Sequence, residues 1–301
     1  MRVLACVLLA LACSTPVAAA PRAACPVGGG TIQYVRAGKL HAVSLASCTD
    51  RVVGKAPAAN RVAGVRTSDA RAKTQRIWVH GKLVFSHAEN GPVLPIKLSG
   101  DGRWLFFAID PYASSSISAD GLDLLVVSTS GGVVHHLGLT LVYPDYLTWC
   151  GGRLVYASGG DRIAVHGKRL LVASPPDWKP RPLWNDSTRT FASPSCSPDG
   201  TTVAVLSQRS SVNARFFATR WQLWRVGLDG VRSLIDAPPA GWADEQPVWS
   251  SRDGSIAFVR ERNGYGRLMV ERRGALYGPV AQLGYQLGFY GHHDWGLAWA
   301  R

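Results

Sequence analysis

A glycine-containing turn recurs four times along this chain at nearly constant spacing. Aligning the segments 96–110, 147–159, 194–208 and 247–261 places Gly102, Gly152, Gly200 and Gly254 in register, 50, 48 and 54 residues apart. A period of this size is typical of arrays and propellers, in which each unit buries its apolar face against the next. Four turns in register favour this interpretation over unrelated hairpins that share common turn chemistry.

Each unit contains the same order of elements. An apolar first strand ends at Leu98, Trp149, Cys196 or Trp249, and a β-branched second strand follows the turn. A third strand is expected at 123–129, 162–167, 222–228 and 267–272, often followed by another Gly turn and a short fourth strand. Pro and Gly favour the two corners of such turns.

Two earlier segments extend the count. Residues 28–53 fit a full unit, and residues 62–87 fit a shorter, degenerate one, with blade boundaries between 54 and 95 left open. Six four-stranded units with almost no helical periodicity predict an all-β chain folded as a six-bladed β-propeller. The tail, 285–301, repeats the order of strand and turn, so we expect it to pair with the amino-terminal unit and close the ring.

The repeat also resembles a known family. "SPDGTTVAVLS" (194 onward in "PSCSPDGTTVAVLSQ") followed by "QLWRVGLDG", and later "SSRDGSIAFVRE", are similar to the repeat of TolB-type six-bladed propellers. The resemblance covers about residues 95–275 well and 26–90 weakly. It implies a non-catalytic binding platform in the cell envelope, or a domain of the kind attached to hydrolases. Gly151-Gly152 replaces Asp-Gly, which is a departure from the pattern.

The first residues have the character of an export signal. Arg2 precedes a short apolar run from Val3 to Ala12, and small residues follow. Ten apolar residues are too few to span a bilayer. We therefore expect a signal peptide at 1–19, cleavage before Ala20, and one propeller domain over 20–301; lipidation at Cys13 is the alternative. No later segment is apolar enough to cross a membrane, so the expected location is secreted or periplasmic.

The chain is basic, with 33 Lys and Arg against 20 Asp and Glu, a formal net charge of +13. The excess is spread along the chain without a basic run, as expected of a charge that maintains solubility. Attraction to anionic wall polysaccharide or lipid headgroups is the functional alternative. Nucleic acid is a poor candidate, because export removes the usual target and no recognition motif is present.

Six cysteines become four once Cys6 and Cys13 leave with the signal. An even number in an oxidising compartment favours disulfides. Cys150 and Cys196 flank the same turn in successive units, and Cys25 and Cys48 lie within the first unit, so we predict these two pairs. No two of the four have the close spacing typical of zinc ligands.

Catalytic motifs are lacking in the sequence. Asp101, Asp199 and Asp253 recur at one position of the turn, which indicates hydrogen bonding within the turn. The sialidase Asp-box does not fit, because Asp199 and Gly200 are adjacent. His135 and His136 should point to opposite faces of a strand, and His292-His293 favours packing or turn hydrogen bonding over metal ligation. We therefore predict no catalytic residues, cofactor or metal.

Propeller topology divides the loops between two faces. The tight Gly turns share one face, and the long inserts at 110–121, 174–194, 207–220 and 236–247 are assigned to the other. Loops on a rigid scaffold concentrate binding residues, and aromatics with Arg are typical of interface hot spots. The candidate binding residues in these inserts are Tyr112, Trp178, Arg181, Trp184, Arg209, Arg215, Phe216 and Trp242.

These patterns favour an exported, non-catalytic propeller that binds a protein partner in the cell envelope. Two alternatives remain open. One is an enzyme acting on glycans or lactones, which would need two or three carboxylates or histidines converging in the central funnel. The other is a binder of anionic wall polysaccharide.

Overall fold

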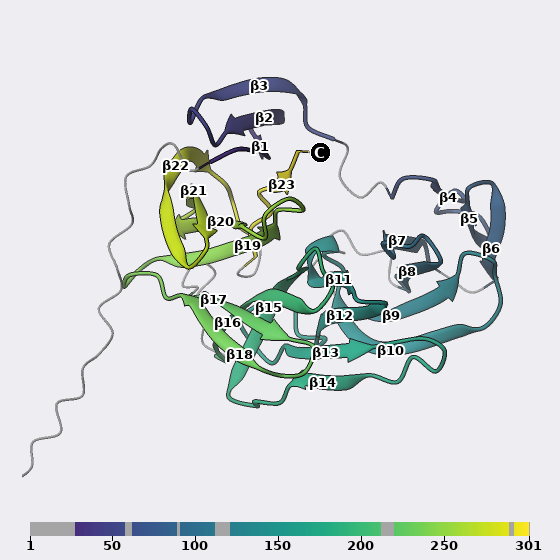
Figure 1. The fold of residues 1–301 in the computed structure, drawn as a ribbon. Coiled ribbons are helices and arrows are strands. Elements are labelled where there is room, and N and C mark those ends of the chain that lie inside the picture. The colour runs from purple at the N-terminus through teal and green to yellow at the C-terminus, as the bar shows by residue number, and fades with distance from the viewer. Residues whose placement is uncertain are drawn as a thin grey trace, which may run out of the picture.

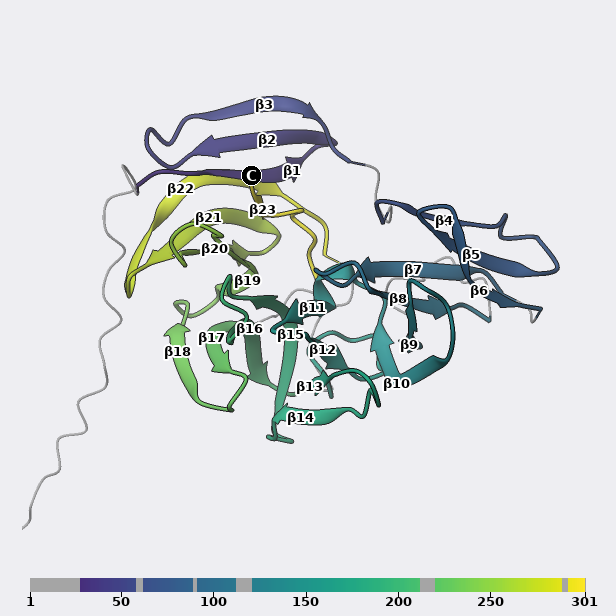
Figure 2. The same cartoon turned by 45° about the vertical axis from the view of Figure 1, so that its right-hand side comes forward.

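The computed structural model describes residues 28–57, 62–88, 91–111, 121–211, 220–288 and 292–300. Their regular structure is antiparallel β-strand, apart from one 3₁₀ helix, η2 (Pro144–Tyr146). The strands form five four-stranded sheets and one three-stranded sheet, arranged around a common centre (Figure 1, Figure 2). The predicted all-β propeller is confirmed. In this part of the chain no helix is long and apolar enough to cross a membrane.

The sheets follow one another along the chain. Sheet 1 contains β1 (Thr31–Arg36), β2 (Lys39–Ser44), β3 (Asp50–Lys55) and β23 (Ala298–Trp299). Sheet 2 contains β4 (Val65–Thr67), β5 (Gln75–Val79) and β6 (Lys82–His87). Sheet 3 contains β7 (Val93–Leu98), β8 (Trp104–Ile109), β9 (Gly121–Ser128) and β10 (Val134–Leu141).

The remaining three sheets each use four consecutive strands. Sheet 4 contains β11 (Leu147–Cys150), β12 (Arg153–Ser158), β13 (Arg169–Ala173) and β14 (Arg181–Trp184). Sheet 5 contains β15 (Arg189–Cys196), β16 (Thr202–Arg209), β17 (Gln222–Gly227) and β18 (Arg232–Asp236). Sheet 6 contains β19 (Ala243–Trp249), β20 (Ile256–Arg262), β21 (Tyr265–Arg272) and β22 (Ala275–Tyr285).

The second strand of sheets 3 to 6 is buried on both faces. In β8, β12, β16 and β20 at least four consecutive residues are buried, because the neighbouring sheets cover both sides of the strand. This explains why these segments are continuously apolar where a strand with one wet face would alternate. The outermost strand of sheet 1, β3, is exposed at every residue.

The recurring turns have the local structure that the sequence predicts. Asp199 Oδ1 accepts hydrogen bonds from the Ser197 hydroxyl at 2.5 Å and from the Thr201 amide at 3.1 Å. Asp101 accepts in the same way from the Ser99 hydroxyl at 2.5 Å and the Arg103 amide at 3.1 Å. The glycine that closes each turn has a φ near +70°, which is the left-handed region that a side chain disfavours. The Asp side chains of these turns therefore satisfy local donors.

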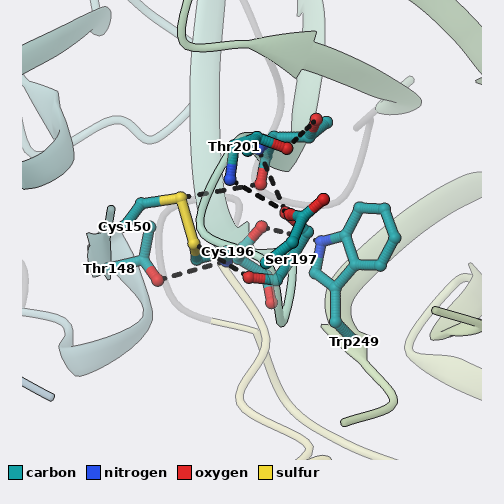
Figure 3. Close-up of a disulfide and its surroundings, with 9 residues drawn as sticks. Thr148, Cys150, Cys196, Ser197, Thr201 and Trp249 are labelled. Atoms are coloured by element: carbon teal, nitrogen blue, oxygen red, sulfur yellow. Dashed lines mark hydrogen bonds between the residues drawn. A yellow bond between two sulfur atoms is a disulfide. The ribbon is translucent and has the colours of Figure 1, made fainter. Parts of the chain in front are cut away.

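A disulfide joins the first strands of sheets 4 and 5 (Figure 3). Cys150 ends β11 and Cys196 ends β15, and the Cys196 amide also donates to Thr148 Oγ1 at 3.2 Å. This predicted pair is confirmed. Cys48 is also disulfide-bonded; Cys25 lies outside the described residues, so the Cys25–Cys48 pair stays a prediction.

The two turns beside this disulfide touch through glycine. A Cβ on Gly151 would lie 2.4 Å from the Gly200 carbonyl oxygen, and a Cβ on Gly200 would lie 2.9 Å from the Gly151 amide nitrogen. An Asp at position 151, as in the other turns, would clash with the neighbouring backbone. Gly151 in place of Asp is thus a consequence of how closely sheets 4 and 5 approach each other.

Tryptophans connect other pairs of neighbouring sheets at the corresponding position. The Trp249 indole, at the end of β19, donates to the Ser195 carbonyl of sheet 5 at 2.9 Å. The Trp299 indole, at the end of β23, donates to the Val248 carbonyl of sheet 6 at 3.0 Å. The tail strand β23 pairs with β1, with Ile32 opposite Trp299. The tail therefore pairs with the amino-terminal unit and takes the position of a first strand in sheet 1.

One predicted strand is wrong. Residues 162–167 form a turn, and the third strand of sheet 4 is β13, which begins at Arg169. Asp161 organises this turn, because its carboxylate accepts from the Ile163 amide at 2.9 Å and contacts His166 Nδ1 at 2.6 Å. The buried Lys168 ammonium donates to the carbonyls of Asp161, Ile163 and His166. Local side-chain bonds have replaced the strand pairing that the apolar alternation suggested.

Candidate functional site

Two of the predicted binding residues lie in the core. Trp178 is 1% exposed and packs edge-on against Trp104 with ring centroids 4.9 Å apart. Trp184 is 6% exposed and packs against Phe191 and Trp224. The expectation that these two aromatics are displayed for a partner is wrong.

The reason lies in the topology of sheet 4. The segment 174–180 connects β13 to β14, so it is a loop between third and fourth strands and lies on the face of the tight turns. Trp178 follows two prolines and has a φ of +53°, which turns its side chain back against sheet 3. Trp184 belongs to the strand β14, where Phe191 and Trp224 of sheet 5 pack against it. The insert was assigned to the wrong face because the position of β13 was mispredicted.

The other predicted binding residues are more accessible or lie outside the described chain. Arg181 and Arg209 are exposed, at the start of β14 and the end of β16. Trp242 is half-buried in the connection from β18 to β19, with the guanidinium groups of Arg262 and Arg267 at 5.7 and 4.4 Å from its ring. Tyr112, Arg215 and Phe216 lie outside the described residues. The structure does not bring Arg181, Arg209 and Trp242 together.

A cavity of about 270 Å³ lies where the first strands of sheets 3 to 6 meet the tail. We call it the axial cavity. Its lining residues come from β7, η2, β11, β15, β19 and the segment before β23: Lys97, Pro144, Asp145, Thr148, Ser193, Pro194, Ser195, Gln246, Pro247, Val248, Asp294, Gly296 and Leu297. The cavity is therefore built from equivalent positions of successive units.

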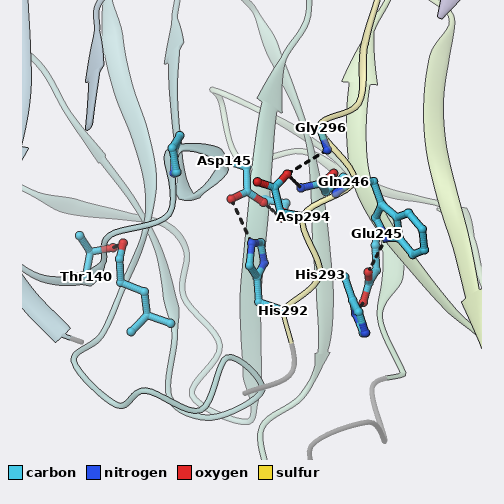
Figure 4. A network of polar contacts seen from close by, with 12 residues as sticks. Thr140, Asp145, Glu245, Gln246, His292, His293, Asp294 and Gly296 are labelled. Carbon is cyan, nitrogen blue, oxygen red and sulfur yellow. Dashed lines mark hydrogen bonds and ion pairs between the residues drawn. The ribbon is translucent and has the colours of Figure 1, made fainter. Parts of the chain in front are cut away.

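Two residues of this lining have a strained backbone. Ser193 and Gln246 have φ values of +46° and +45°, each directly before a proline and each within a β-bulge of its strand. Non-glycine residues with positive φ cost free energy and are concentrated at functional sites. Here the bulges direct both side chains to the cavity. Ser193 Oγ donates to Asp145 at 2.6 Å. Gln246 Nε2 donates to Asp294 at 3.0 Å (Figure 4).

Charged side chains at the cavity are tied to the neighbouring unit. The Lys97 ammonium donates to the carbonyls of Pro144 and Leu147 at 3.1 and 2.7 Å. Burial lowers the pKa of Lys97, against the opposing charge of Asp145. Asp145 also lies 3.5 Å from His292 Nε2, and the His292 ring packs at a tilt against Tyr143 with centroids 3.9 Å apart. The lining thus offers one cation and two carboxylates in fixed positions.

A second polar cluster lies beside this cavity. His293 Nδ1 is 2.9 Å from Glu245 Oε1 (Figure 4). The Trp295 indole donates to Glu245 Oε2 at 3.3 Å. Glu261 accepts from the Gly264 amide. Burial and then the charge of Glu245 raise the pKa of Glu261 to about 7. The three side chains, Glu245, Glu261 and His293, are all buried and offer ligand atoms within 4.8 Å of one another.

The sequence contains part of the signal for this cluster. His292 and His293 are adjacent in the sequence, and both are packed and in ionic contact, but with different partners: His292 with Asp145 and His293 with Glu245. Glu245 and Glu261 lie near the ends of paired strands, where Glu261 is opposite Ala243, two residues from Glu245 on the same face. Their convergence depends on the register of β19 and β20 and on the path of the tail, which the sequence does not specify.

The comparisons with known proteins agree with this architecture. No protein-family model matches the chain, and no curated protein matches it. Among solved structures, TolB from Acinetobacter baumannii superposes with a TM-score of 0.51 at 15% identity, over 90% of this chain and 66% of that one. A putative TolB from Agrobacterium tumefaciens gives 0.47 at 15% identity, over 87% and 91% of the two chains. A puromycin hydrolase gives 0.45 at 14% identity, over 89% and 46%.

At such low identity a structural likeness establishes the fold alone. The sequence repeat, the six sheets and the superposition on Acinetobacter TolB agree on that point. This chain has a β-propeller fold similar to that of TolB.

Proposed function

We propose that this chain is an exported, non-catalytic β-propeller that binds a protein partner of the cell envelope, and that a short segment of the partner enters the axial cavity. The observation that carries this proposal is the lining of the cavity by two strained, non-glycine residues, Ser193 and Gln246. Strained residues of this kind persist only where the surrounding structure fixes them, and they are concentrated at binding and active sites. The Cys150–Cys196 disulfide supports an oxidising location.

The dimensions of the cavity favour a protruding chain end or loop tip. Its volume of about 270 Å³ is just below the range of ligand sites, which span about 300–1,000 Å³. Hydroxyl, amide, carboxylate and ammonium groups line it together, which suits the alternating donors and acceptors of a peptide. A polysaccharide chain would need a longer open groove.

A crosslinking experiment tests this proposal. We expect a photoreactive amino acid at Ser195, which lines the axial cavity, to give one discrete product in an envelope extract. The same amino acid at Ser233, exposed on β18, is the matched control and should give none. In a partner-binding assay without the photoreactive amino acid, Ser195→Tyr, which fills the cavity, should abolish binding. Ser233→Tyr should not. A crosslinked product from the photoreactive amino acid at Ser233 alone, or at Arg209 alone, would contradict the assignment of the cavity as the binding site.

The enzymatic alternative has one observation in its favour, the convergence of Glu245, Glu261 and His293. The space beside Glu245 and His293 is about 10 Å³, which is the threshold for a single water molecule and far below the size of a sugar ring. Binding is therefore the preferred function. Turnover of a glycan or lactone by the purified chain, lost in Glu261→Gln, would reverse this preference.

A further inference from the structure

We propose that Glu245, Glu261 and His293 form a binding site for one divalent metal ion of the kind that Zn²⁺ and Mn²⁺ represent. The three residues come from β19, β20 and the tail, and each presents a ligand atom within 4.8 Å of the others. Among the described residues no other group of three His, Cys, Asp or Glu side chains is placed in this way. This inference is independent of the proposed partner binding.

One nitrogen of the His293 imidazole faces Glu245, and the other is unpaired among the described residues. The His293 side chain is fully buried, and its Nε2 has no hydrogen-bond partner in the described part of the chain. Nδ1, in contrast, lies 2.9 Å from Glu245. Buried ring nitrogens are normally bonded, because leaving one unpaired costs free energy. An ion shared by His293 and Glu245 would bind Nδ1, because Nδ1 faces Glu245 and Nε2 points to the other side of the ring.

The charges of the cluster also favour a bound cation. Glu245 and Glu261 are 3% and 2% exposed, and in the described chain His293 is the sole basic side chain in ion-pair contact with either carboxylate. Two buried carboxylates repel each other, and one imidazole offsets at most one of the two charges. A divalent ion would offset both charges.

A small space adjoins two of the three ligand side chains, Glu245 and His293. The small space of about 10 Å³ is lined by Glu245 and His293 together with Gln246 and Ser193 of the axial cavity. Ligands about 2.1 Å from a common ion are at most about 4.2 Å apart, so the side chains need to close by less than about 1 Å. Gly288 packs directly on the imidazole, where a Cβ would lie 2.3 Å from Nε2.

The ligand types select the class of metal. Two carboxylates and one imidazole form a mixed oxygen and nitrogen set without sulfur, which suits Zn²⁺ or Mn²⁺ better than Cu⁺. Ca²⁺ takes six to eight oxygen ligands, and the described residues offer too few here. An ion at this site would connect the tail to sheet 6 immediately beside the axial cavity.

Direct metal titration tests the proposal. We use the untagged full chain, stripped with a chelator, and measure Zn²⁺ and Mn²⁺ binding by calorimetry and by metal analysis after dialysis. We expect about one equivalent bound per chain, and an affinity at least about tenfold lower in Glu261→Gln and His293→Gln. Glu271→Gln is the matched control, since Glu271 is an equally buried glutamate that pairs with Arg225 at 3.2 Å, and it should bind like the wild type.

A second variant and a spectroscopic measurement guard against misfolding. Gly288→Ala keeps all three ligands but places a methyl group against His293, so it should weaken binding while retaining the circular dichroism of the wild type. Co²⁺ bound to the wild type should give visible bands that shift in His293→Gln. The proposal is overturned if the stripped wild type binds neither Zn²⁺ nor Mn²⁺, or if Glu261→Gln and His293→Gln bind them as tightly as Glu271→Gln.

Discussion

The indole N–H of Trp299 donates a hydrogen bond to the backbone carbonyl of Val248 at 3.0 Å, across the interface between sheets 1 and 6. Because Trp299 belongs to β23, this contact and the pairing of β23 with β1 join the two ends of the described chain. We therefore predict that a chain truncated after Gly284 is insoluble or much less stable, since it loses a strand and exposes an edge.

Two point variants make this prediction more specific. Trp299→Phe removes the hydrogen bond and should cost about 1 kcal/mol, while Trp299→Ala also removes packing and should cost clearly more. Urea unfolding of the three chains measures the series. Melting of the truncated chain at the temperature of the wild type would show that the tail does not close the ring.

Removing the Cys150–Cys196 disulfide should destabilise the interface between sheets 4 and 5. We expect the double variant Cys150→Ala/Cys196→Ala to lose about 2–4 kcal/mol of unfolding free energy. Denaturant unfolding, with the reduced wild type as a second reference, measures this loss. Peptide mapping without reduction should recover this pair together with Cys25–Cys48; crossed pairs would contradict the assignment.

Trp178 should behave as a core residue in mutagenesis. Because it is buried among Trp104, Phe106 and Trp149, we expect Trp178→Ala to cost about 3–5 kcal/mol of stability. Trp242→Ala, at a half-buried position on a connection, is the matched control and should cost much less. Thermal melting compares the two. A Trp178→Ala chain as stable as the wild type would mean that this side chain is displayed on the surface after all.

The pKa of Asp199 should depend on its turn partner. Hydrogen bonds from the Ser197 hydroxyl, and then from the Thr201 amide, hold the pKa of Asp199 below its ordinary value. A lowered pKa in the folded state stabilises the fold above the ordinary pKa of about 4, and this contribution is lost as the pH falls through the lowered value. Ser197→Ala should therefore raise the pKa of Asp199. NMR titration of the carboxyl carbon measures it, and no change on substitution would argue against a structural role of the turn.

Processing of the amino terminus is a further prediction. The small residues Val17 and Ala19 fit a cleavage rule, so we expect the mature chain to begin at Ala20 or within a residue or two of it. Amino-terminal sequencing of the protein recovered from the medium or the periplasm checks this. Recovery of a chain that begins at Met1, or that carries a lipid on Cys13, would contradict it.

The repeat could be predicted from the sequence because its signal is local. Ser197, Asp199 and Gly200 define a turn through bonds among neighbours, and the second strands are apolar enough to identify alone. The Cys150–Cys196 pair followed from alignment of two units. In contrast, Asp161 and Lys168 stabilise a turn at 162–167, where the alternation of apolar and polar residues indicated a strand. Because this strand was mispredicted, the insert that contains Trp178 was assigned to the wrong face.

The candidate site was harder to predict because it depends on contacts between distant segments. Glu245 and His293 are 48 residues apart, and Ser193 and Asp145 are also 48 apart. Nothing in the local sequence distinguishes Glu245 from a solvent-exposed glutamate. The bulges that turn Ser193 and Gln246 toward the cavity precede Pro194 and Pro247, and this recurring proline is the one signal that a closer alignment of the units would have provided.

The four buried apolar clusters of the described residues predict where unfolding of the propeller begins. One cluster joins sheets 1 and 6, another joins sheets 2 and 3, and the other two join sheets 3 to 6 and sheets 4 and 5; none of the four contains side chains from both sheet 1 and sheet 2. A ring of units with one weak interface is expected to begin unfolding at that interface. Amide protons of β3 and β4, which flank the weak interface, should thus exchange with solvent first, and those of β12 and β16, beside the Cys150–Cys196 bond, should exchange last.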